Sequence, residues 1–220
     1  NKTGSRGPVP CAATGVLKLA RKQEAHRWQR LSGEEEVETP PWYDPGLDPD
    51  IAAALERYGI VGGDVLDLCT GPATQAIALA DRGFSVTAMD IASTAVEKAC
   101  IRAREEGLDI VFHQDDILAS HLDRAFDLVF DRGCFHIFPR DKRRDYVPAV
   151  SRLIRTGGYL MLKCFSHLET RPEGPYRIAP TEIEELFSPI YDIPPIQHTT
   201  FRGHHQKPPP TAPFCVMRKR

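Results

Sequence analysis

The stretch from Asp64 to Asp90, DVLDLCTGPATQAIALADRGFSVTAMD, constrains the fold more than any other part of the chain. It opens with an apolar run, Val65 to Leu68, which is typical of a buried strand, and a turn of small residues follows. Apolar residues then recur at near-helical spacing up to Gly83, and a second apolar strand, Phe84–Met89, ends at Asp90. Strand, tight turn, helix, strand and acid make up half of a nucleotide-binding α/β fold.

The turn after the first strand indicates what kind of ligand such a fold would bind. Gly71 is its only glycine, and Cys69 and Ala73 occupy the positions that flank it in a G-x-G-x-G turn. Pro72 has no backbone N–H, which is unfavourable for binding phosphate. Asp90 is placed to accept hydrogen bonds from the two hydroxyls of a ribose. The turn therefore favours an adenosine ligand that lacks phosphates.

This stretch resembles motif I of the class I S-adenosylmethionine-dependent methyltransferases, which usually reads close to V-L-D-L-G-C-G-T-G. Asp67 and Leu68 match the motif, Gly71 matches its central glycine, and Asp90 matches the ribose-binding acid, whereas Cys69 and Ala73 depart from it. The resemblance implies that S-adenosyl-L-methionine is the cofactor and S-adenosyl-L-homocysteine the product. It assigns to the cofactor site Asp67, Leu68, Cys69, Gly71, Ala73, Asp90 and the adjacent Ile91.

A third short strand, Ile110 to Phe112, leads to a pair of acids. In the methyltransferase family an acid after this strand accepts a hydrogen bond from the adenine amino group, and the next apolar residue packs on the ring. Asp116 and Ile117 match that position best, and Asp115 is the neighbouring candidate. The alternative is that the two acids only cap a turn.

The fourth strand, Phe126–Phe130, ends at Asp131, which we also assign to the cofactor site. Ligands of open α/β sheets bind outside the carboxyl ends of the strands, so the ends at Cys69, Asp90 and Asp131 should meet at one crevice. We therefore expect the reacting group near residues 131–136.

Two further segments resemble the thiopurine S-methyltransferase branch of the family, which includes thiol and halide methyltransferases. The first is the Asp131-Arg132-Gly133 segment, and the second begins at Glu173-Gly174-Pro175-Tyr176. In that branch the arginine of D-R-G lies at the substrate. The resemblance thus implies that Arg132 contacts the substrate, and we expect Cys134 to line the same pocket.

Several side chains near this crevice are candidates for catalysis or substrate binding. Arg132 is a candidate to stabilise a thiolate or another anion of the acceptor, or alternatively to pair with Asp131 or a C-terminal acid. His136 is a candidate general base, but a histidine in an apolar run is more often a packed structural residue. Trp42 either walls the substrate pocket or anchors its segment to the core. The adjacent His204 and His205 are a weak metal signal, and we predict no metal site.

Length, charge and cysteine usage bound the remaining possibilities. The 220 residues suit one methyltransferase domain, 40–220, after an N-terminal tail, 1–39, that contains a possible lid helix at Cys11–Leu31. A net charge of −2 makes nucleic acid an improbable partner, and no apolar run is long enough for a membrane span. The six cysteines form no C-x-x-C pair, and we interpret them as free thiols in a reducing, cytoplasmic compartment.

The predicted architecture is α/β: a Rossmann-like, seven-stranded class I methyltransferase sheet with helices on both faces and a C-terminal antiparallel hairpin. The fifth strand is expected at Tyr159–Phe165, and the hairpin at Ile190–Thr200 with Pro213–Met217. The favoured function is methyl transfer to a small-molecule soft nucleophile, a thiol. The alternatives are an N-methyltransferase acting on a protein side chain or a small amine, and a non-catalytic module that binds the cofactor or RNA.

Overall fold

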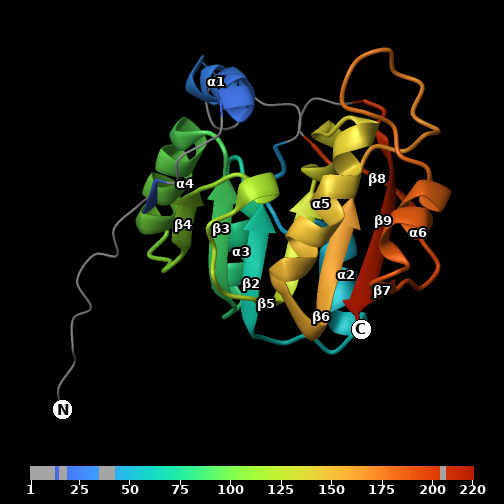
Figure 1. Ribbon diagram of the computed structural model, residues 1–220. Helices are drawn as coiled ribbons and strands as arrows, with labels where there is room; N and C mark the ends of the chain where they lie inside the picture. Colours follow the sequence, from blue (N-terminus) through green and yellow to red (C-terminus); the bar gives the residue numbers. More distant parts are fainter. Residues whose placement is uncertain (1–12, 15–18, 35–42, 204–206) are drawn as a thin grey trace.

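The computed structural model describes residues 13–14, 19–34, 43–203 and 207–220 (Figure 1). Trp42, His204 and His205 lie outside the described residues, and so do parts of the 1–39 segment. The helices are α1 (Leu19–Glu34), α2 (Pro49–Arg57), α3 (Thr74–Asp81), α4 (Ser93–Glu105), α5 (Arg140–Arg152) and α6 (Pro180–Phe187), with 3-10 turns η1 (Ile117–Ala119) and η2 (Phe135–Ile137). The strands are β1 (Ala13–Thr14), β2 (Asp64–Leu68), β3 (Ser85–Asp90), β4 (Val111–Gln114), β5 (Phe126–Arg132), β6 (Ile154–Lys163), β7 (Tyr191–Asp192), β8 (Gln197–Thr200) and β9 (Thr211–Lys219).

One mixed sheet runs through the molecule in the order β1-β4-β3-β2-β5-β6-β9-β7, and β8 pairs with β9 beside this path. Strands β4, β3, β2, β5 and β6 are parallel, whereas β7 and β8 pair antiparallel with β9, and β9 pairs antiparallel with β6. The strand order reverses direction at β2, where β3 and β5 flank it. That switch point is where open α/β sheets bind their ligands.

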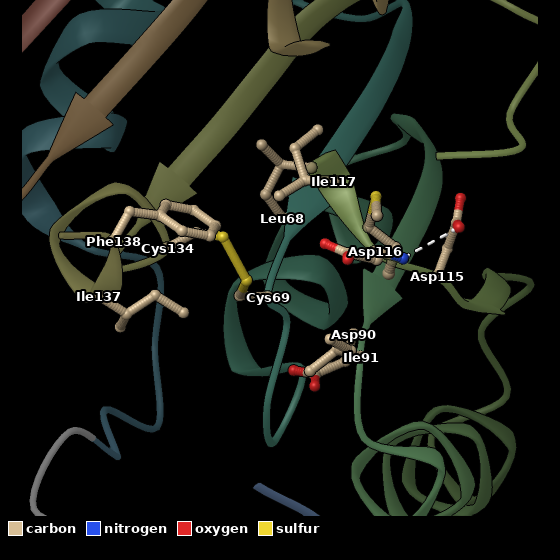
Figure 2. Close-up of a pocket in the computed structure, with 11 residues that line it drawn as sticks. Leu68, Cys69, Asp90, Ile91, Asp115, Asp116, Ile117, Cys134, Ile137 and Phe138 are labelled. Carbon is tan, nitrogen blue, oxygen red and sulfur yellow. Dashed lines mark hydrogen bonds between the residues drawn. A yellow bond between two sulfur atoms is a disulfide. The ribbon is translucent and has the colours of Figure 1, made fainter. Parts of the chain in front are cut away.

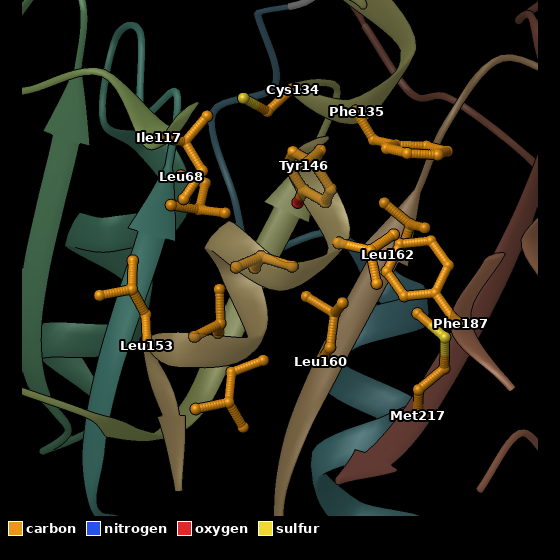
Figure 3. Packing of buried hydrophobic residues seen from close by; sticks show 14 of the residues in the cluster. Leu68, Ile117, Cys134, Phe135, Tyr146, Leu153, Leu160, Leu162, Phe187 and Met217 are labelled. Atoms are coloured by element: carbon orange, nitrogen blue, oxygen red, sulfur yellow. The ribbon is translucent and has the colours of Figure 1, made fainter. Parts of the chain in front are cut away.

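Side chains that alternate along the central strands build a core on each face of the sheet. Leu66 and Leu68 of β2 pack with Tyr146 and Val150 of α5. Val65 of β2 belongs to the other cluster, with residues of α2, α3 and α4. Figure 3 shows the first cluster, in which aliphatic side chains such as Leu153, Leu160 and Leu162 pack with aromatic ones such as Tyr146 and Phe187. Helices therefore cover both faces, as expected.

The sheet differs from the expectation of seven strands. The described part of the chain adds the two-residue β1 against β4 at one edge and the separate strand β8 against β9. The C-terminal antiparallel pairing is confirmed, and β9 forms its centre.

Two predicted boundaries were wrong. The described N-terminal helix is α1, which begins at Leu19 and continues to Glu34 rather than spanning Cys11–Leu31. The fifth parallel strand, β6, begins at Ile154 rather than at Tyr159. Gly157 and Gly158 lie inside this strand and do not precede it. Gly157 has φ +80°, and the pairing of β5 with β6 shifts register between Phe126 and Leu128. The two glycines therefore mark an irregularity within β6, whereas the sequence had predicted that they form the loop before the strand.

Candidate active site

A pocket lies at the carboxyl edge of the sheet, over the switch point (Figure 2). It is enclosed by the residues that end or follow the four parallel strands β2, β3, β4 and β5. The lining residues are Leu68, Cys69, Met89, Asp90, Ile91, Asp115, Asp116, Ile117, Cys134, Ile137 and Phe138. The strand ends therefore converge on one crevice, as the topology of such sheets requires.

The turn after β2 adopts a glycine-like backbone with few glycines. Cys69 and Ala73 have φ values of +52° and +58°, and Gly71 between them has φ +49°. Side chains with a Cβ rarely take this left-handed conformation, which costs about 1 kcal/mol or more per residue. The two departures from motif I thus keep the shape of the turn at some cost in backbone strain.

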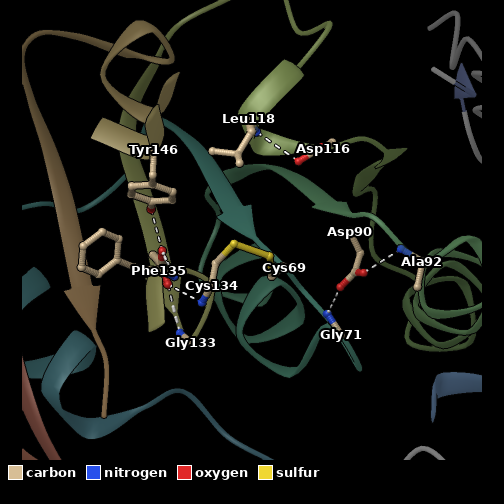
Figure 4. The surroundings of a disulfide bond; sticks show 11 residues. Cys69, Gly71, Asp90, Ala92, Asp116, Leu118, Gly133, Cys134, Phe135 and Tyr146 are labelled. Atoms are coloured by element: carbon tan, nitrogen blue, oxygen red, sulfur yellow. Dashed lines mark hydrogen bonds between the residues drawn. A yellow bond between two sulfur atoms is a disulfide. The ribbon is translucent and has the colours of Figure 1, made fainter. Parts of the chain in front are cut away.

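Asp90 joins this turn to the start of α4. One of its carboxylate oxygens accepts a hydrogen bond from the backbone N–H of Gly71 at 3.0 Å, and the other accepts from Ala92 at 2.9 Å (Figure 4). Burial raises the pKa of Asp90 above its ordinary value, although these N–H donors lower it. The carboxylate lines the pocket in a fixed orientation.

The two acids after β4 have different surroundings. Asp115 accepts hydrogen bonds from the Ser120 hydroxyl at 2.7 Å and from the backbone of Asp116 and His121, so both of its oxygens have partners within the protein. Asp116 accepts from the N–H of Leu118 at 3.1 Å and caps η1. In Figure 2 the Asp116 carboxylate points toward the pocket, whereas that of Asp115 points away. By orientation, the Asp116 carboxylate rather than that of Asp115 faces a ligand in the pocket.

Two further acids lie beneath the pocket rather than in its wall. Asp67 is buried and accepts a hydrogen bond from the Thr70 hydroxyl at 2.6 Å. Burial raises its pKa to about 7 against the effect of that bond, and the charges of Asp131 and Asp90 add to the rise. Asp131 is fully buried and accepts from the N–H groups of Gly133, Cys134 and Phe135 and from the Tyr146 hydroxyl at 2.5 Å.

Asp131 therefore holds the turn after β5 in place, and burial raises its pKa to about 6. Of the acids predicted at the cofactor, Asp90, Asp115 and Asp116 line the pocket. Asp67 and Asp131 shape the loops that carry it.

Cys69 and Cys134 form a disulfide across the pocket, with their Cα atoms 5.6 Å apart (Figure 4). The prediction that these cysteines are free thiols was therefore wrong. Both follow strands that are adjacent in the sheet but are 65 residues apart in the chain, so spacing alone gives no sign of the pair. Cys164 and Cys215 are buried free thiols, as expected.

Arg132 lies next to this turn, but its guanidinium is already paired. Its Nε donates to Asp48 at 2.9 Å, a terminal nitrogen lies 3.6 Å from Asp44, and the group stacks over the Phe201 ring. The same side chain donates to the backbone carbonyl of Arg202 at 2.6 Å. Its acidic partners come from the segment before α2, rather than from Asp131 or the C-terminal region.

A buried lysine completes this network, and the sequence reasoning missed it. Lys163, at the end of β6, is wholly buried and binds Asp48 at 2.8 Å and Asp50 at 2.6 Å. Burial works to raise the pKa of Asp48, but Lys163 and Arg132 together hold it below its ordinary value. Thr199 of β8 also donates to Asp50 at 2.8 Å. The only sequence signal is a lysine that ends an apolar strand.

His136 packs within the loop after β5. Its Nδ1 accepts a hydrogen bond from the backbone N–H of Phe165 at 3.0 Å, and its ring contacts Phe165 and Phe201 edge-on or tilted. Burial, reinforced by nearby arginines, lowers its pKa to about 3. The ring is therefore neutral with its proton on Nε2, and its one lone pair is already used. This geometry favours the packed role over that of a general base.

The pocket also contains residues that were not predicted. Ile137 and Phe138 lie beside Cys134 in the lining, and Met89 precedes Asp90. The run from Cys134 to Phe138 is apolar apart from His136, and a helical turn there places residues 134, 137 and 138 on one side. The spacing of these three residues was the sequence signal that could have predicted Ile137 and Phe138 in the pocket.

Comparison with known proteins identifies the family. A family model described as "Methyltransferase domain" matches residues 65–158, the segment that runs from β2 and the turn after it through β3 and β5. The 2-heptyl-1-hydroxyquinolin-4(1H)-one methyltransferase of Mycobacteroides abscessus is 31% identical over 158 residues, which cover 70% of this chain and 69% of that protein. The chain belongs to the class I S-adenosylmethionine-dependent methyltransferases.

Other relatives of this methyltransferase agree with the assignment. The probable thiol methyltransferase 2 of Arabidopsis thaliana is 26% identical over 157 residues, 70% of each protein. A solved structure reported for the conversion of a disulfide bond into a thioacetal group during echinomycin biosynthesis is also similar. Its TM-score is 0.76 at 25% sequence identity, and the match covers 89% of this chain and 92% of that one. The expectations of fold, enzyme class and cofactor are thereby confirmed. No helix in the described part of the chain has the length and apolarity to span a bilayer.

Proposed function

We propose that this methyltransferase moves the methyl group of S-adenosylmethionine to a small-molecule soft nucleophile, a thiol. The observation that carries the proposal is the division of the pocket in Figure 2. Carboxylates of Asp90 and Asp116 lie on one side, and the other side, toward the acceptor, is lined by Cys134, Ile137 and Phe138. An apolar acceptor side without a carboxylate suits a thiol better than a protonated amine.

The residues on the acidic side fit the adenosine part of the cofactor. Asp90 is placed to accept from ribose hydroxyls, since each of its oxygens has a further lone pair beside the backbone bond that it already accepts. Asp116 is the acceptor for the adenine amino group, and Ile91 and Ile117 are the apolar residues that flank the ring. Cys69, Gly71 and Ala73 supply the turn beneath the methionine portion.

The protein's own residues contribute alignment and exclusion of water. When bound, the cofactor supplies a methyl group that is activated by its sulfonium. A thiol reacts as its thiolate, so an acceptor with a low thiol pKa needs no base from the protein. Phe138 and Ile137 keep water from the acceptor side, and the turn fixed by Asp131 sets the position of Cys134.

Arg132 then acts by positioning rather than by direct contact. Its bonds to Asp48 and to the carbonyl of Arg202 connect the segment before α2 with the loop after β8, next to the end of β5. Helix α1 also connects parts of the site that are far apart in the chain. Its Gln29 and Ser32 form hydrogen bonds with residues in the first half of α4, which are Ser93, Thr94 and Lys98. We infer that α1 covers the cofactor end of the site.

Two relatives support a sulfur acceptor, and a third supports an alternative methyl acceptor. A probable thiol methyltransferase and a structure reported for the conversion of a disulfide bond into a thioacetal group are both similar to this chain. The Mycobacteroides relative acts, by its name, on a hydroxylated quinolone. A hydroxyl on the nitrogen of a heteroaromatic ring is therefore the second candidate acceptor, and it fits the same apolar side.

A competition assay with labelled methyl donor tests the proposal. Purified, reduced protein is given matched aromatic and aliphatic thiols, 2-heptyl-1-hydroxyquinolin-4(1H)-one, and amines of the same shape. We expect turnover of at least one thiol at a kcat/KM that exceeds that of its matched amine and of the quinolone. Turnover confined to the quinolone or to an amine would overturn the thiol assignment but leave the methyltransferase activity in place.

A further inference from the structure

The disulfide between Cys69 and Cys134 lies inside the pocket that the proposed function requires. Cys69 follows β2 in the turn of motif I, and Cys134 follows β5 in the turn fixed by Asp131. Both side chains belong to the lining. In Figure 2 the sulfur–sulfur bond lies between the side formed by Asp90, Ile91 and Asp116 and the side formed by Ile137 and Phe138. It therefore stands where the cofactor and acceptor sides meet.

We propose that Cys69 and Cys134 are a reversible redox site that controls access of the cofactor to this pocket. The inference rests on the proposed function, because it assigns a regulation to the same site. In the oxidised protein the bridge ties the turn of motif I to the turn after β5 and occupies the space between the two sides. Reduction separates the sulfurs and frees that space, so the reduced protein is the competent form.

The geometry of the two turns suits repeated opening and closing. The backbone at Cys134 is held by its own N–H bond to Asp131 at 2.7 Å and by that of Phe135 at 2.9 Å. Cys69 precedes Thr70, whose N–H donates to the carbonyl of Met89 at 3.0 Å. The backbones of both turns are therefore held when the bridge is broken, and only the two side chains rotate apart. A Cα separation of 5.6 Å lies within the range that disulfides span.

The exchange balances with a dithiol reductant as the co-reactant. A thiolate of the reductant attacks the sulfur of Cys69, the less buried of the two, and the bond to Cys134 breaks with its electron pair left on Cys134. The second thiol of the reductant then attacks the mixed disulfide and releases Cys69. The reductant ends as a disulfide, and its two protons pass to the two cysteines.

The other buried thiols provide an internal comparison. Cys164 and Cys215 are free, and burial raises the pKa of each above its ordinary value, which keeps them protonated and unreactive. Neither lines the pocket. Oxidation should therefore act at Cys69 and Cys134 and spare this second pair.

The test compares S-adenosylhomocysteine binding by oxidised and reduced protein in calorimetric titrations. Peptide mapping of each sample, with alkylation before and after reduction, reports whether a peptide bridged between residues 69 and 134 is present. We expect the bridged peptide in the oxidised sample only, and at least about tenfold weaker binding by that sample. Cys134→Ser should bind equally with or without oxidant, whereas the matched variant Cys164→Ser should keep the redox dependence.

The outcomes separate this inference from the function on which it rests. Equal or tighter binding by the oxidised protein, or the absence of a bridged peptide after oxidation, would overturn the redox site while the cofactor assignment stands. Absence of binding by the reduced wild-type protein would instead overturn the proposed cofactor role of the pocket.

Discussion

At the scale of single residues, the turn after β2 shows how a binding loop keeps its shape after losing glycines. Cys69 and Ala73 both take the left-handed conformation, and Ala73 is completely buried at the start of α3. Such strain persists where the surrounding structure fixes the backbone, and it concentrates at functional sites. Here the bonds from Gly71 to Asp90 and from Thr70 to Met89 fix it.

Replacing Cys69 with glycine should relieve part of this strain. In reducing buffer we expect Cys69→Gly to raise the free energy of unfolding by about 1 kcal/mol, because glycine adopts positive φ without a steric penalty. Urea denaturation measures the change. Cys134→Ala is the matched control, since it also removes the bridge but leaves residue 69 strained. A Cys69→Gly protein no more stable than this control would contradict the strain argument.

The buried carboxyl of Asp67 makes stability depend on pH. Its pKa is about 7 in the folded protein, above the ordinary 3.8, so between these values the folded state holds a proton that the unfolded state releases. This contribution to stability is complete below about pH 4 and is lost as pH rises toward 7, with a slope of up to about 1.4 kcal/mol per pH unit.

Asp67→Asn isolates this effect from that of His136, whose lowered pKa acts in the opposite direction. We expect the stability of the wild type relative to Asp67→Asn to fall between pH 4 and pH 7. Chemical denaturation across that range provides the measurement. A difference that is constant with pH would show that Asp67 titrates normally.

At the scale of secondary structure elements, one buried ion network joins α2, β5, β6 and β8. Asp48 caps the N-terminus of α2, and Lys163 at the end of β6 and Arg132 at the end of β5 both bind its carboxylate. Asp50 extends the network to β8 through Thr199. Elements far apart in the sequence are thereby held together beside the pocket.

Removal of the lysine should be costly because it leaves carboxylates buried without their cation. We expect Lys163→Met to lower the free energy of unfolding by about 3–5 kcal/mol. Lys142→Met, which removes an exposed pair with Asp145, should change it by less than about 1 kcal/mol. Thermal or urea denaturation compares the two variants. Similar small losses in both would mean that the network contributes little.

The sequence predicted those elements whose signals are local. Apolar runs located β2, β3 and β5. Asp90, at the end of β3, and Asp116 both line the pocket, and their role toward the cofactor stays a prediction. Features that depend on distant contacts were missed. The pairing of Cys69 with Cys134 and of Lys163 with Asp48 becomes visible only when residues 65 and 115 positions apart in the chain are brought together.

At the scale of the whole molecule, the fold places every pocket residue at one edge of one sheet. Two cores, one on each face, pack against the parallel strands, and the ends of β2, β3, β4 and β5 with the loops after them line the pocket. Figure 1 shows α1 above this edge, beside α4. The antiparallel strands β7 and β9 complete the sheet beyond β6.

The most direct test of this account is calorimetric titration of reduced protein with S-adenosylhomocysteine, repeated on two aspartate variants. Asp90→Ala removes the carboxylate that lines the pocket, and Asp81→Ala removes an exposed one at the end of α3. Thermal denaturation confirms that each variant is folded. The account predicts micromolar binding by the wild type and by Asp81→Ala, and a loss of about tenfold or more in Asp90→Ala. Unchanged binding by a folded Asp90→Ala protein, or none by the wild type, would contradict it.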